Sequence, residues 1–235
     1  MNIPRAMMID LDDTLIDYTS GAAPTWRSVC EEIEPRVTGL DASILYDAIT
    51  RTRGWFWSDP DRHRTGRANT IAAHQSIVHT SLIELGFDLP DLALEIAQRF
   101  HGLREKTIVL FPETIPCLKE LTEAGISLAM ITNGDGAGQR RKIERFGLER
   151  YFDHIFIEGE LGFGKPEPAV YKTAMAALDS TPEETWCVGD NIEWEVAGPQ
   201  RLGIYAVWVD RSCAGVPADS DIVPDRIIQS LAELL

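Results

Sequence analysis

Positive charge is scarce in this sequence. Its 235 residues include 22 Lys and Arg against 37 Asp and Glu, which gives a formal net charge of −15. Proteins that bind nucleic acids use Lys and Arg to neutralise the phosphates of the backbone. The deficit therefore argues against a nucleic-acid partner, and an anionic small substrate would need positive charge concentrated at one place.

Long apolar runs are missing as well. No run approaches the roughly 20 residues that a membrane-spanning helix requires, and Met1 to Arg5 lack the apolar segment of a secretion signal. We therefore expect a cytoplasmic protein with no membrane association. Cysteines are few and none has C-x-x-C spacing, which indicates reduced, packed thiols and argues against a metal site built on sulfur. The four are Cys30, Cys117, Cys187 and Cys213.

The order of apolar patterns predicts two units. After Leu15 the periodicity is helical for roughly ninety residues. Helices are expected over 20–33, 41–55, 67–85 and from 90 through 100. From Ile108 onward, strands and helices alternate. Strands are expected over 126–131, 155–157, 185–188 and 204–209, and helices over 112–125, 138–146, 168–178, 195–202 and 227–235.

Strands that are separated by helices imply right-handed crossovers and a parallel sheet. We therefore predict an α/β fold, in which a Rossmann-like core with a parallel β-sheet between helices carries an inserted all-α domain. The core would comprise residues 1–15 and 108–235, and the insertion residues 16–107.

The first strand ends in an unusual group of acids. The apolar run Ala6 to Ile9 predicts a buried strand, and Asp10, Asp12 and Asp13 follow it within four positions. Carboxylates this close repel one another, so they lie either on a solvated loop or around a cation. A calcium loop is excluded, because Leu15 stands where such a loop requires Gly. Ligands of α/β proteins bind at the carboxyl ends of parallel strands, which makes this stretch a candidate active site.

The second expected strand runs into Thr132, Asn133 and Gly134. A hydroxyl, an amide and a backbone N–H at a glycine suit an anion, although ordinary loops have the same composition. Farther along, Gly159 to Lys165 fits the phosphate-binding pattern G-x-x-x-x-G-K. Pro166 follows where a nucleotide-binding loop requires Ser or Thr, so that function is rejected. Lys165 is then either a fixed positive charge near a strand end or a surface lysine.

Another acid follows the expected strand 185–188. Asp190 could complete a metal site with Asp10 and Asp12, because Mg²⁺ prefers hard oxygen ligands. Alternatively, Asp190 caps the helix that follows it.

Taken together and in this order, these residues resemble the motifs of the haloacid dehalogenase-like superfamily of phosphohydrolases. The first motif, D-x-D-x-T, matches Asp10, Asp12 and Thr14. The later motifs match Thr132, Lys165 in G-K-P and Asp190 in G-D, with Glu195 in the downstream acidic position. Two residues depart from the pattern: similar members often carry Asp at position 195 and a small residue such as Ala at position 199, where this chain has Glu and Pro.

The resemblance implies a Mg²⁺-dependent phosphatase with a helical (C1-type) cap and a small phosphorylated metabolite as substrate. Asp10 would attack phosphorus and Asp12 would act as general acid and base. The Asp10 and Asp190 carboxylates and the Asp12 carbonyl would bind Mg²⁺, and Thr14 and Glu195 would support the site. The resemblance places Thr132, Asn133, Gly134 and Lys165 around the phosphate; Asp13 is assigned to local structure.

Related activities are weighed against this hypothesis. A dehalogenase of the superfamily lacks the second acid, so Asp12 argues against it. Phosphonate cleavage requires a cap lysine, and no Lys occurs between Met1 and Glu105. A sugar-phosphate mutase shares all four motifs and stays open. A catalytically silent binding module would be expected to have lost an acid, and none is missing.

Within the expected insertion, the stretch Trp55 to Arg67 combines aromatic residues with Arg and His. Arg62 and Arg64 are candidates to bind an organic monophosphate. In the alternative interpretation, Trp55 and Trp57 fill the core of the insertion, and the arginines pair with Asp59 and Asp61 on a solvated loop. For the assembly we expect a monomer or a homodimer.

Overall fold

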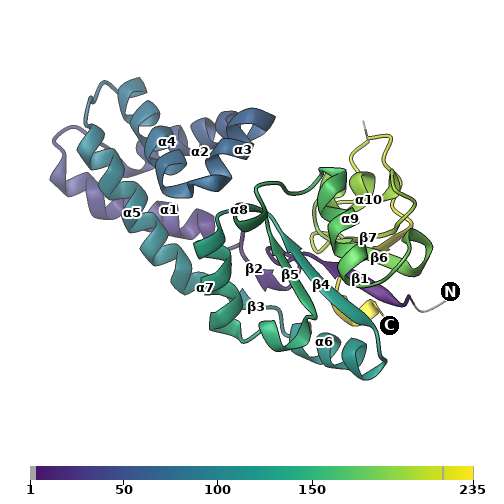
Figure 1. Cartoon of the computed structure of the whole chain (residues 1–235). Helices are drawn as coiled ribbons and strands as arrows, with labels where there is room; N and C mark the ends of the chain where they lie inside the picture. Colours follow the sequence, from purple (N-terminus) through teal and green to yellow (C-terminus); the bar gives the residue numbers. More distant parts are fainter. Residues whose placement is uncertain (1–3, 219, 235) are drawn as a thin grey trace. The chain divides into compact units, whose positions relative to one another are not determined.

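The computed structural model describes residues 4–218 and 220–234. The chain divides into two compact units: Met1–Asp17 with Val109–Leu235, and Tyr18–Ile108. The first boundary thus follows Asp17 rather than residue 15, and the second follows Ile108 rather than residue 107. We describe the two as the core unit and the helical unit (Figure 1).

A six-stranded sheet forms the centre of the core unit, in the order β5-β4-β1-β6-β7-β8, with every neighbouring pair parallel. The strands are β1 (Ala6–Ile9), β4 (Ser127–Thr132), β5 (His154–Ile157), β6 (Thr185–Gly189), β7 (Tyr205–Val209) and β8 (Arg226–Ile228). All four residues of β1 are buried, because this strand has neighbours on both edges and side chains packed against both faces. The predicted α/β class is therefore confirmed.

The strand order fixes where a ligand can bind. From β1 the chain continues to β4 and β5 on one side, and to β6, β7 and β8 on the other, so the order reverses at β1. In parallel α/β sheets, the crevice at such a reversal lies outside the carboxyl ends of the strands. The residues that follow β1, β4 and β6 therefore meet at one edge.

Helices flank this sheet (Figure 1). They are α6 (Thr114–Glu123), α7 (Gly136–Phe146), α8 (Glu158–Leu161), α9 (Pro168–Ala177) and α10 (Gly198–Gln200), with 3₁₀ turns η2 (Glu149–Tyr151), η3 (Pro182–Glu184) and η5 (Leu231–Glu233). Helix α7 begins after Asp135, whose side chain accepts a hydrogen bond from the Gly138 N–H, and ends at Gly147 in the left-handed conformation (φ 61°).

Two predictions for the C-terminal part are wrong. The expected helix 227–235 is the strand β8 followed by η5; Leu235 lies outside the described residues. Its apolar residues do not distinguish a helix from a short buried strand, and pairing with β7 decides for the strand. The expected helix 195–202 is a π-helical turn, η4 (Ile192–Ala197), followed by the short α10.

A second, two-stranded sheet in the core unit pairs the residues just before the helical unit with those just after it. Strand β2 (Ile16–Asp17) pairs antiparallel with β3 (Val109–Leu110), with Asp17 opposite Val109. Strands of two residues leave no periodicity in the sequence, which is why they were not predicted.

The helical unit contains α1 (Ala22–Ile33), η1 (Glu34–Arg36), α2 (Ala42–Ser58), α3 (Pro60–Ala68), α4 (Thr70–Glu84) and α5 (Pro90–Thr107). Trp26 is fully buried at its centre and stacks on Phe100, with ring centroids 3.8 Å apart. No helix was predicted over 56–66, and the alternative interpretation of Arg62 and Arg64 placed them on a solvated loop; the structure has α3 there. It forms because the Asp59 side chain accepts from the Arg62 N–H (2.8 Å) and Pro60 occupies the first turn.

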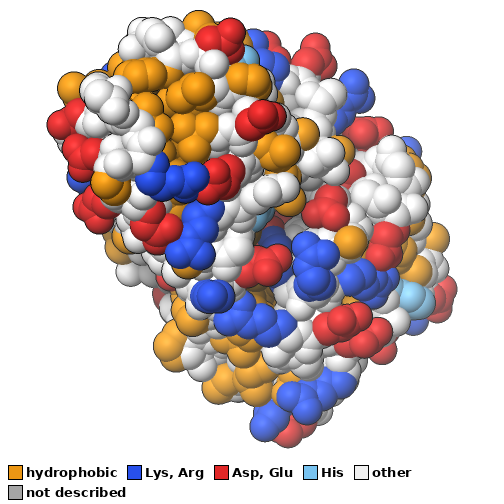
Figure 2. Space-filling view, turned by 90° about the vertical axis from the view of Figure 1, so that its left-hand side faces the viewer, with side chains coloured by type: hydrophobic (Ala, Val, Ile, Leu, Met, Phe, Trp, Pro, Cys, Tyr) orange, Lys and Arg blue, Asp and Glu red, His pale blue; other side chains and the backbone are white. Residues whose placement is uncertain are grey.

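Ion pairs join neighbouring helical segments of this unit, so several of its arginines are already paired with acidic side chains. Examples are Arg36–Glu95 (2.6 Å), Arg51–Glu84 (2.8 Å) and Arg99–Glu32 (2.8 Å). Basic and acidic side chains are accordingly interspersed on the face shown in Figure 2. No described helix is both long and apolar enough to cross a membrane.

Candidate active site

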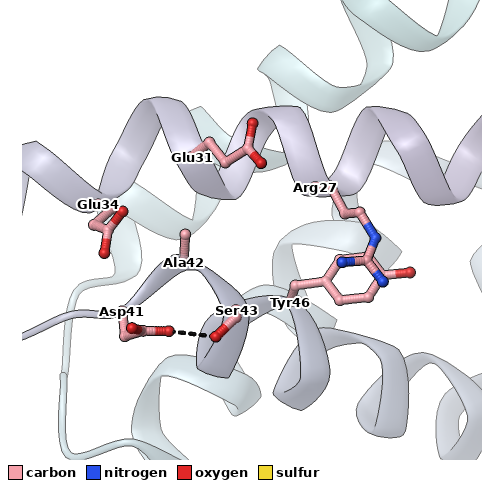
Figure 3. Close-up of a pocket in the computed structure, with 7 residues that line it drawn as sticks. All are labelled: Arg27, Glu31, Glu34, Asp41, Ala42, Ser43 and Tyr46. Carbon is pink, nitrogen blue, oxygen red and sulfur yellow. Dashed lines mark hydrogen bonds between the residues drawn. The ribbon is translucent and has the colours of Figure 1, made fainter.

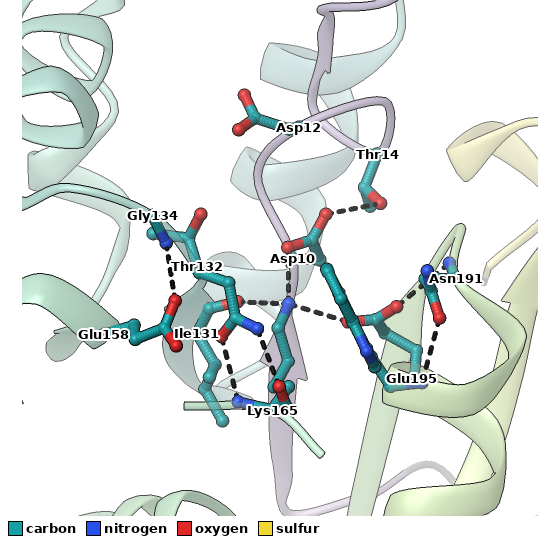
Figure 4. A network of polar contacts seen from close by, with 12 residues as sticks. Asp10, Asp12, Thr14, Ile131, Thr132, Gly134, Glu158, Lys165, Asn191 and Glu195 are labelled. Atoms are coloured by element: carbon teal, nitrogen blue, oxygen red, sulfur yellow. Dashed lines mark hydrogen bonds and ion pairs between the residues drawn. The ribbon is translucent and has the colours of Figure 1, made fainter. Parts of the chain in front are cut away.

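Asp10 lies directly at the carboxyl end of β1 and is only 8% exposed. Its N–H donates to the carbonyl of Val188 on β6 (3.0 Å), which fixes the backbone between two strands. Its Oδ2 accepts from the Thr14 hydroxyl (3.1 Å) and its Oδ1 from the Lys165 ammonium (2.5 Å). Two side chains thus hold the carboxylate in a single orientation (Figure 4).

Lys165 lies next to the Asp10 carboxylate, below it in the view of Figure 4, and is almost completely buried. Its ammonium donates to Asp10 Oδ1 and to the Ile131 carbonyl (2.8 Å), and it forms an ion pair with Glu195 Oε1 at 2.6 Å. Burial works to lower the pKa of Lys165, but the carboxylates of Asp10 and Glu195 outweigh it and raise the pKa above its ordinary value. Lys165 is therefore a permanent cation, and the interpretation as a surface lysine is wrong.

The residues that follow β4 hold the loop of Lys165. The Asn133 side chain donates to the Lys165 carbonyl (2.7 Å) and accepts from the Lys165 N–H (2.9 Å). The Gly134 N–H donates to the Glu158 carboxylate (3.0 Å). Both groups were expected to face phosphate, and the structure gives each of them a protein partner.

Glu195 reaches Lys165 from the π-helical turn η4. Its Oε1 pairs with Lys165 and its Oε2 accepts from the Asn191 N–H (2.9 Å), while the side chain is only 1% exposed. Burial raises the pKa of Glu195 to about 7, an effect that Lys165 opposes and Asp10 reinforces. The longer side chain at this position is thus accommodated in the same ion-paired cluster as Asp10 (Figure 4).

The π-helical turn η4 cannot continue past Gly198, because Pro199 follows. The Gly198 N–H donates to the Glu193 carbonyl, five residues back. A continued π pattern would give the Trp194 carbonyl a donor at residue 199, and Pro has no N–H. The buried Tyr171 hydroxyl of α9 donates to that carbonyl instead (2.5 Å).

The site has an excess of negative charge. Asp190 follows β6, and its carbonyl accepts from the Trp208 indole N–H (2.7 Å). Burial raises the pKa of Asp190 to about 9, reinforced by the negative charges of Asp10, Glu195 and Asp13. A divalent cation would relieve this repulsion.

The donor set suits Mg²⁺. Carboxylates of Asp10 and Asp190 and the main-chain carbonyl of Asp12 are hard oxygen donors, and water completes such sites. Over residues 4–218 and 220–234, no three His, Cys, Asp or Glu side chains form a ready-made metal cluster. The proposed set does not need one, because only two of its protein ligands are side chains.

Asp12 is held by helix α7, which the sequence did not indicate. Lys142 Nζ lies 2.7 Å from both carboxylate oxygens, and Gln139 Nε2 donates to Oδ2 (3.0 Å). The Asp12 carboxylate points away from Asp10 (Figure 4). The same Gln139 nitrogen contacts the hydroxyl of Thr132 (2.5 Å), which is 1% exposed. Residues three apart share a helix face, so positions 139 and 142 of the predicted helix offered a signal.

Arg211 is a second residue that the sequence did not indicate. It donates to the carbonyls of Asp13 (3.2 Å) and Thr14 (2.8 Å), pairs with Glu113 (2.7 Å) and stacks over Phe111 at 3.4 Å. These contacts hold the loop after β1, where Asp13 adopts the left-handed conformation (φ 61°).

The candidate substrate residues of the helical unit lie on α3. Arg62 stacks over Trp55 (3.9 Å) and donates to the carbonyls of Trp55 (2.7 Å) and Phe56 (3.3 Å), so it caps the end of α2. Arg62 also pairs with Asp59 (3.8 Å), as the alternative interpretation had it, while Arg64 is exposed. Binding of substrate by these two arginines stays a prediction.

An open pocket of about 280 Å³ occurs elsewhere in the helical unit, between α1 and α2 (Figure 3). Three of its side chains are acidic, and Arg27 stacks over Tyr46 at 4.2 Å. A phosphorylated ligand is a poor match for this lining. The pocket is lined by Arg27, Glu31, Glu34, Asp41, Ala42, Ser43 and Tyr46.

Sequence comparison finds relatives that match almost the whole chain. A phosphoserine phosphatase of Thermus thermophilus is 31% identical, covering 98% of this chain and 97% of the relative. An N-acylneuraminate-9-phosphatase of Mus musculus is 30% identical (98% and 92%), and a glyceraldehyde 3-phosphate phosphatase of Methanopyrus kandleri is 28% identical (98% and 95%).

Solved structures share the fold. YfnB of Bacillus subtilis, whose crystal structure has magnesium bound, matches with a TM-score of 0.75 at 21% identity, covering 99% of this chain and 97% of its own. A 2-haloacid dehalogenase of Pseudomonas syringae matches with a TM-score of 0.63 at 28% identity (98% and 96%). The family model of haloacid dehalogenase-like hydrolases matches residues 4–203, which include β1, β4, β5 and β6 with their polar ends. The chain belongs to the haloacid dehalogenase-like hydrolases.

Proposed function

We propose that this protein is a magnesium-dependent phosphatase that hydrolyses a small organic phosphomonoester through an aspartyl-phosphate intermediate. The observation that carries the proposal is the environment of Asp10, a desolvated carboxylate at the strand reversal, oriented by Thr14 and Lys165. The phosphatase names of the three relatives, at 28–31% identity over nearly the full chain, support the same reaction.

The first chemical step is assigned to Asp10. Its carboxylate oxygen forms a bond to phosphorus while the bond from phosphorus to the leaving oxygen breaks, and Asp12 gives that oxygen a proton. Asp12 then takes a proton from a water molecule, whose oxygen attacks phosphorus and releases phosphate from Asp10. Thr132 supplies a hydroxyl to the phosphoryl oxygens as their charge shifts.

The Asp10 and Asp190 carboxylates and the Asp12 carbonyl would hold Mg²⁺. When bound, this ion supplies the positive charge that lets an anionic phosphate approach the carboxylates. Lys165 contributes by neutralising the carboxylates of Asp10 and Glu195, since it forms an ion pair with each of them.

The helical unit is assigned the selection of the substrate, as the cap of the family would do. Arg62 and Arg64 stay its candidate contacts. The likeness in fold to dehalogenases does not favour dehalogenation, because Asp12 is present as a second acid and the sequence relatives named above are phosphatases.

Phosphate release tests the proposal. Wild type and Asp10→Asn are assayed with 4-nitrophenyl phosphate and a panel of phosphorylated metabolites, with Mg²⁺, with EDTA, and after Mg²⁺ is restored. We expect turnover that depends on Mg²⁺, and a loss on the order of 10³-fold or more in the variant, because the attacking group is removed.

The matched control is Asp221→Asn, which makes the same change at an exposed residue. Near-native activity of Asp10→Asn, or halide release from 2-chloropropionate without metal, contradicts the proposal. Little net phosphate release together with activation by a bisphosphate would indicate a mutase instead.

A further inference from the structure

Helix α7 controls both oxygens of the Asp12 carboxylate. Lys142 Nζ lies 2.7 Å from each of them, and Gln139 Nε2 donates to Oδ2 at 3.0 Å. The side chains of Lys142 and Asp12 are only 16% and 24% exposed. This ion pair is therefore partly shielded from water, and its attraction is screened less than that of the exposed pairs of the helical unit.

Gln139 connects Asp12 to the loop that follows β4. It is 3% exposed, and its amide nitrogen also contacts the Thr132 hydroxyl (2.5 Å) and the Asn133 carbonyl (2.8 Å). An amide nitrogen has two protons to share among these three oxygens and accepts none, so in its contact with Thr132 the hydroxyl oxygen is the acceptor and the hydroxyl proton is directed elsewhere. One buried amide thus sets the direction in which Thr132 can donate and the position of Asp12.

The helix that carries both residues is firmly fixed at its N-terminal half. The Asp135 side chain caps it, and Arg140 forms a two-pronged ion pair with Glu160 of α8, with both distances 2.7 Å. Gln139 and Lys142 lie three positions apart on one face. The helix is therefore a rigid support from which the loop after β1 is held.

We propose that Gln139 and Lys142 are positioning residues for the general acid and base Asp12. This inference rests on the proposed phosphatase function. Neither residue touches the reacting atoms: they act through Asp12 by restricting its rotamers, and Gln139 also acts through Thr132. Without them, Asp12 would sample several orientations and protonate the leaving oxygen less often.

The dependence of rate on the leaving group separates positioning from a general structural effect. The ratio kcat/KM includes the step in which the leaving oxygen departs. 4-Nitrophenolate departs without a proton, whereas an alkoxide needs one. We expect Lys142→Ala to lower kcat/KM about 10-fold or more for alkyl phosphates and about twofold or less for 4-nitrophenyl phosphate, since general acid catalysis contributes about 10²–10⁴-fold. Gln139→Ala should lower kcat/KM for both substrates, because it also acts through Thr132, and more strongly for alkyl phosphates.

Two variants complete the design. Lys172→Ala removes the same charge from an exposed position on α9 and should match wild type with both substrates. Lys142→Arg keeps a cationic donor and should recover part of the lost activity toward alkyl phosphates. If Lys142→Ala melts early, Lys142→Met, which keeps the length of the side chain, is used in its place.

Equal losses of Lys142→Ala with both substrates overturn the inference, and so does wild-type behaviour of this variant. Crystal structures of wild type and Lys142→Ala give a readout that needs no turnover. The Asp12 carboxylate should contact Gln139 in wild type and leave this position in the variant; an unmoved Asp12 contradicts the positioning role. Absence of Mg²⁺-dependent turnover in wild type would instead overturn the proposed function. The crystal structures would still show whether Lys142 holds the Asp12 carboxylate, because they need no turnover.

Discussion

Gly189, the last residue of β6, shows how closely the buried charges are packed. A Cβ atom at this position would lie 2.2 Å from Glu195 Cγ and 3.0 Å from Asp10 Cβ. Both neighbours are buried and both are paired with Lys165, so neither can move without loss of an ion pair. The absence of a side chain at 189 is thus a requirement of the site.

We therefore expect Gly189→Ala to lower phosphatase activity at least about 10-fold and to reduce the free energy of unfolding by about 1–3 kcal/mol, as overpacking does. Urea titration and phosphate release measure the two effects. Gly102→Ala is the control, because nothing lies within 4 Å of a Cβ at that helical position; it should stabilise the chain slightly. A variant at 189 with the stability and activity of wild type would contradict this packing.

At the scale of elements, the π-helical turn η4 depends on one hydroxyl. Burial raises the pKa of Tyr171 above its ordinary value, so its hydroxyl stays protonated and donates to the Trp194 carbonyl. We expect Tyr171→Phe to lower the free energy of unfolding by about 1–3 kcal/mol, because a buried carbonyl loses its donor. We also expect lower kcat, since Glu195 lies on this turn.

Denaturation and steady-state kinetics test this prediction. Tyr205→Phe is the control, because its hydroxyl bond to the Asp225 carbonyl is longer (3.3 Å) and exposed. If the two variants lose the same stability, the hydroxyl of Tyr171 does not support η4.

At the scale of the whole molecule, the two units are expected to respond differently to acid. His74 of the helical unit is 7% exposed, and burial, assisted by His101 and Arg53, lowers its pKa to about 3. Its Nδ1 lies 2.8 Å from His101 Nε2, and the rings of Trp26, Trp57 and Phe100 pack around it. In the unfolded chain, a histidine has a pKa of about 6.5.

Between pH 6.5 and 3, the unfolded state therefore binds one more proton than the folded state at this site, and stability falls as the pH falls. From pH 7 to pH 5 the loss is about 2 kcal/mol for this one group. Amide exchange in α4 and α5 measures it. His74→Gln should remove this part of the pH dependence, whereas His154→Gln, at an exposed position of the core unit, should not. An unchanged pH slope in His74→Gln contradicts the assignment.

The sequence predicts those elements and site residues that can be recognised from a few neighbouring residues. In the run from Ala6 to Asp10, an apolar strand is followed directly by an acid. In Gly164-Lys165-Pro166, a lysine lies between two residues with restricted or special backbone conformations. Both signals lie within a few neighbouring residues, so the sequence alone was enough to select these positions. Helix α3 was missed because its residues are polar and show no apolar periodicity. The contacts of Lys142 and Arg211 join residues more than a hundred positions apart, and only the packed fold reveals them.

The short pairing of β2 with β3 makes it possible to exchange the helical unit for another insertion. Because Asp17 lies opposite Val109, the helical unit leaves and re-enters the core unit at two adjacent points of one ribbon. A two-residue turn between these points would complete an ordinary β-hairpin. Residues 18–108 thus form a cassette with fixed joints, so another insertion can replace it while the residues around Asp10 stay unchanged.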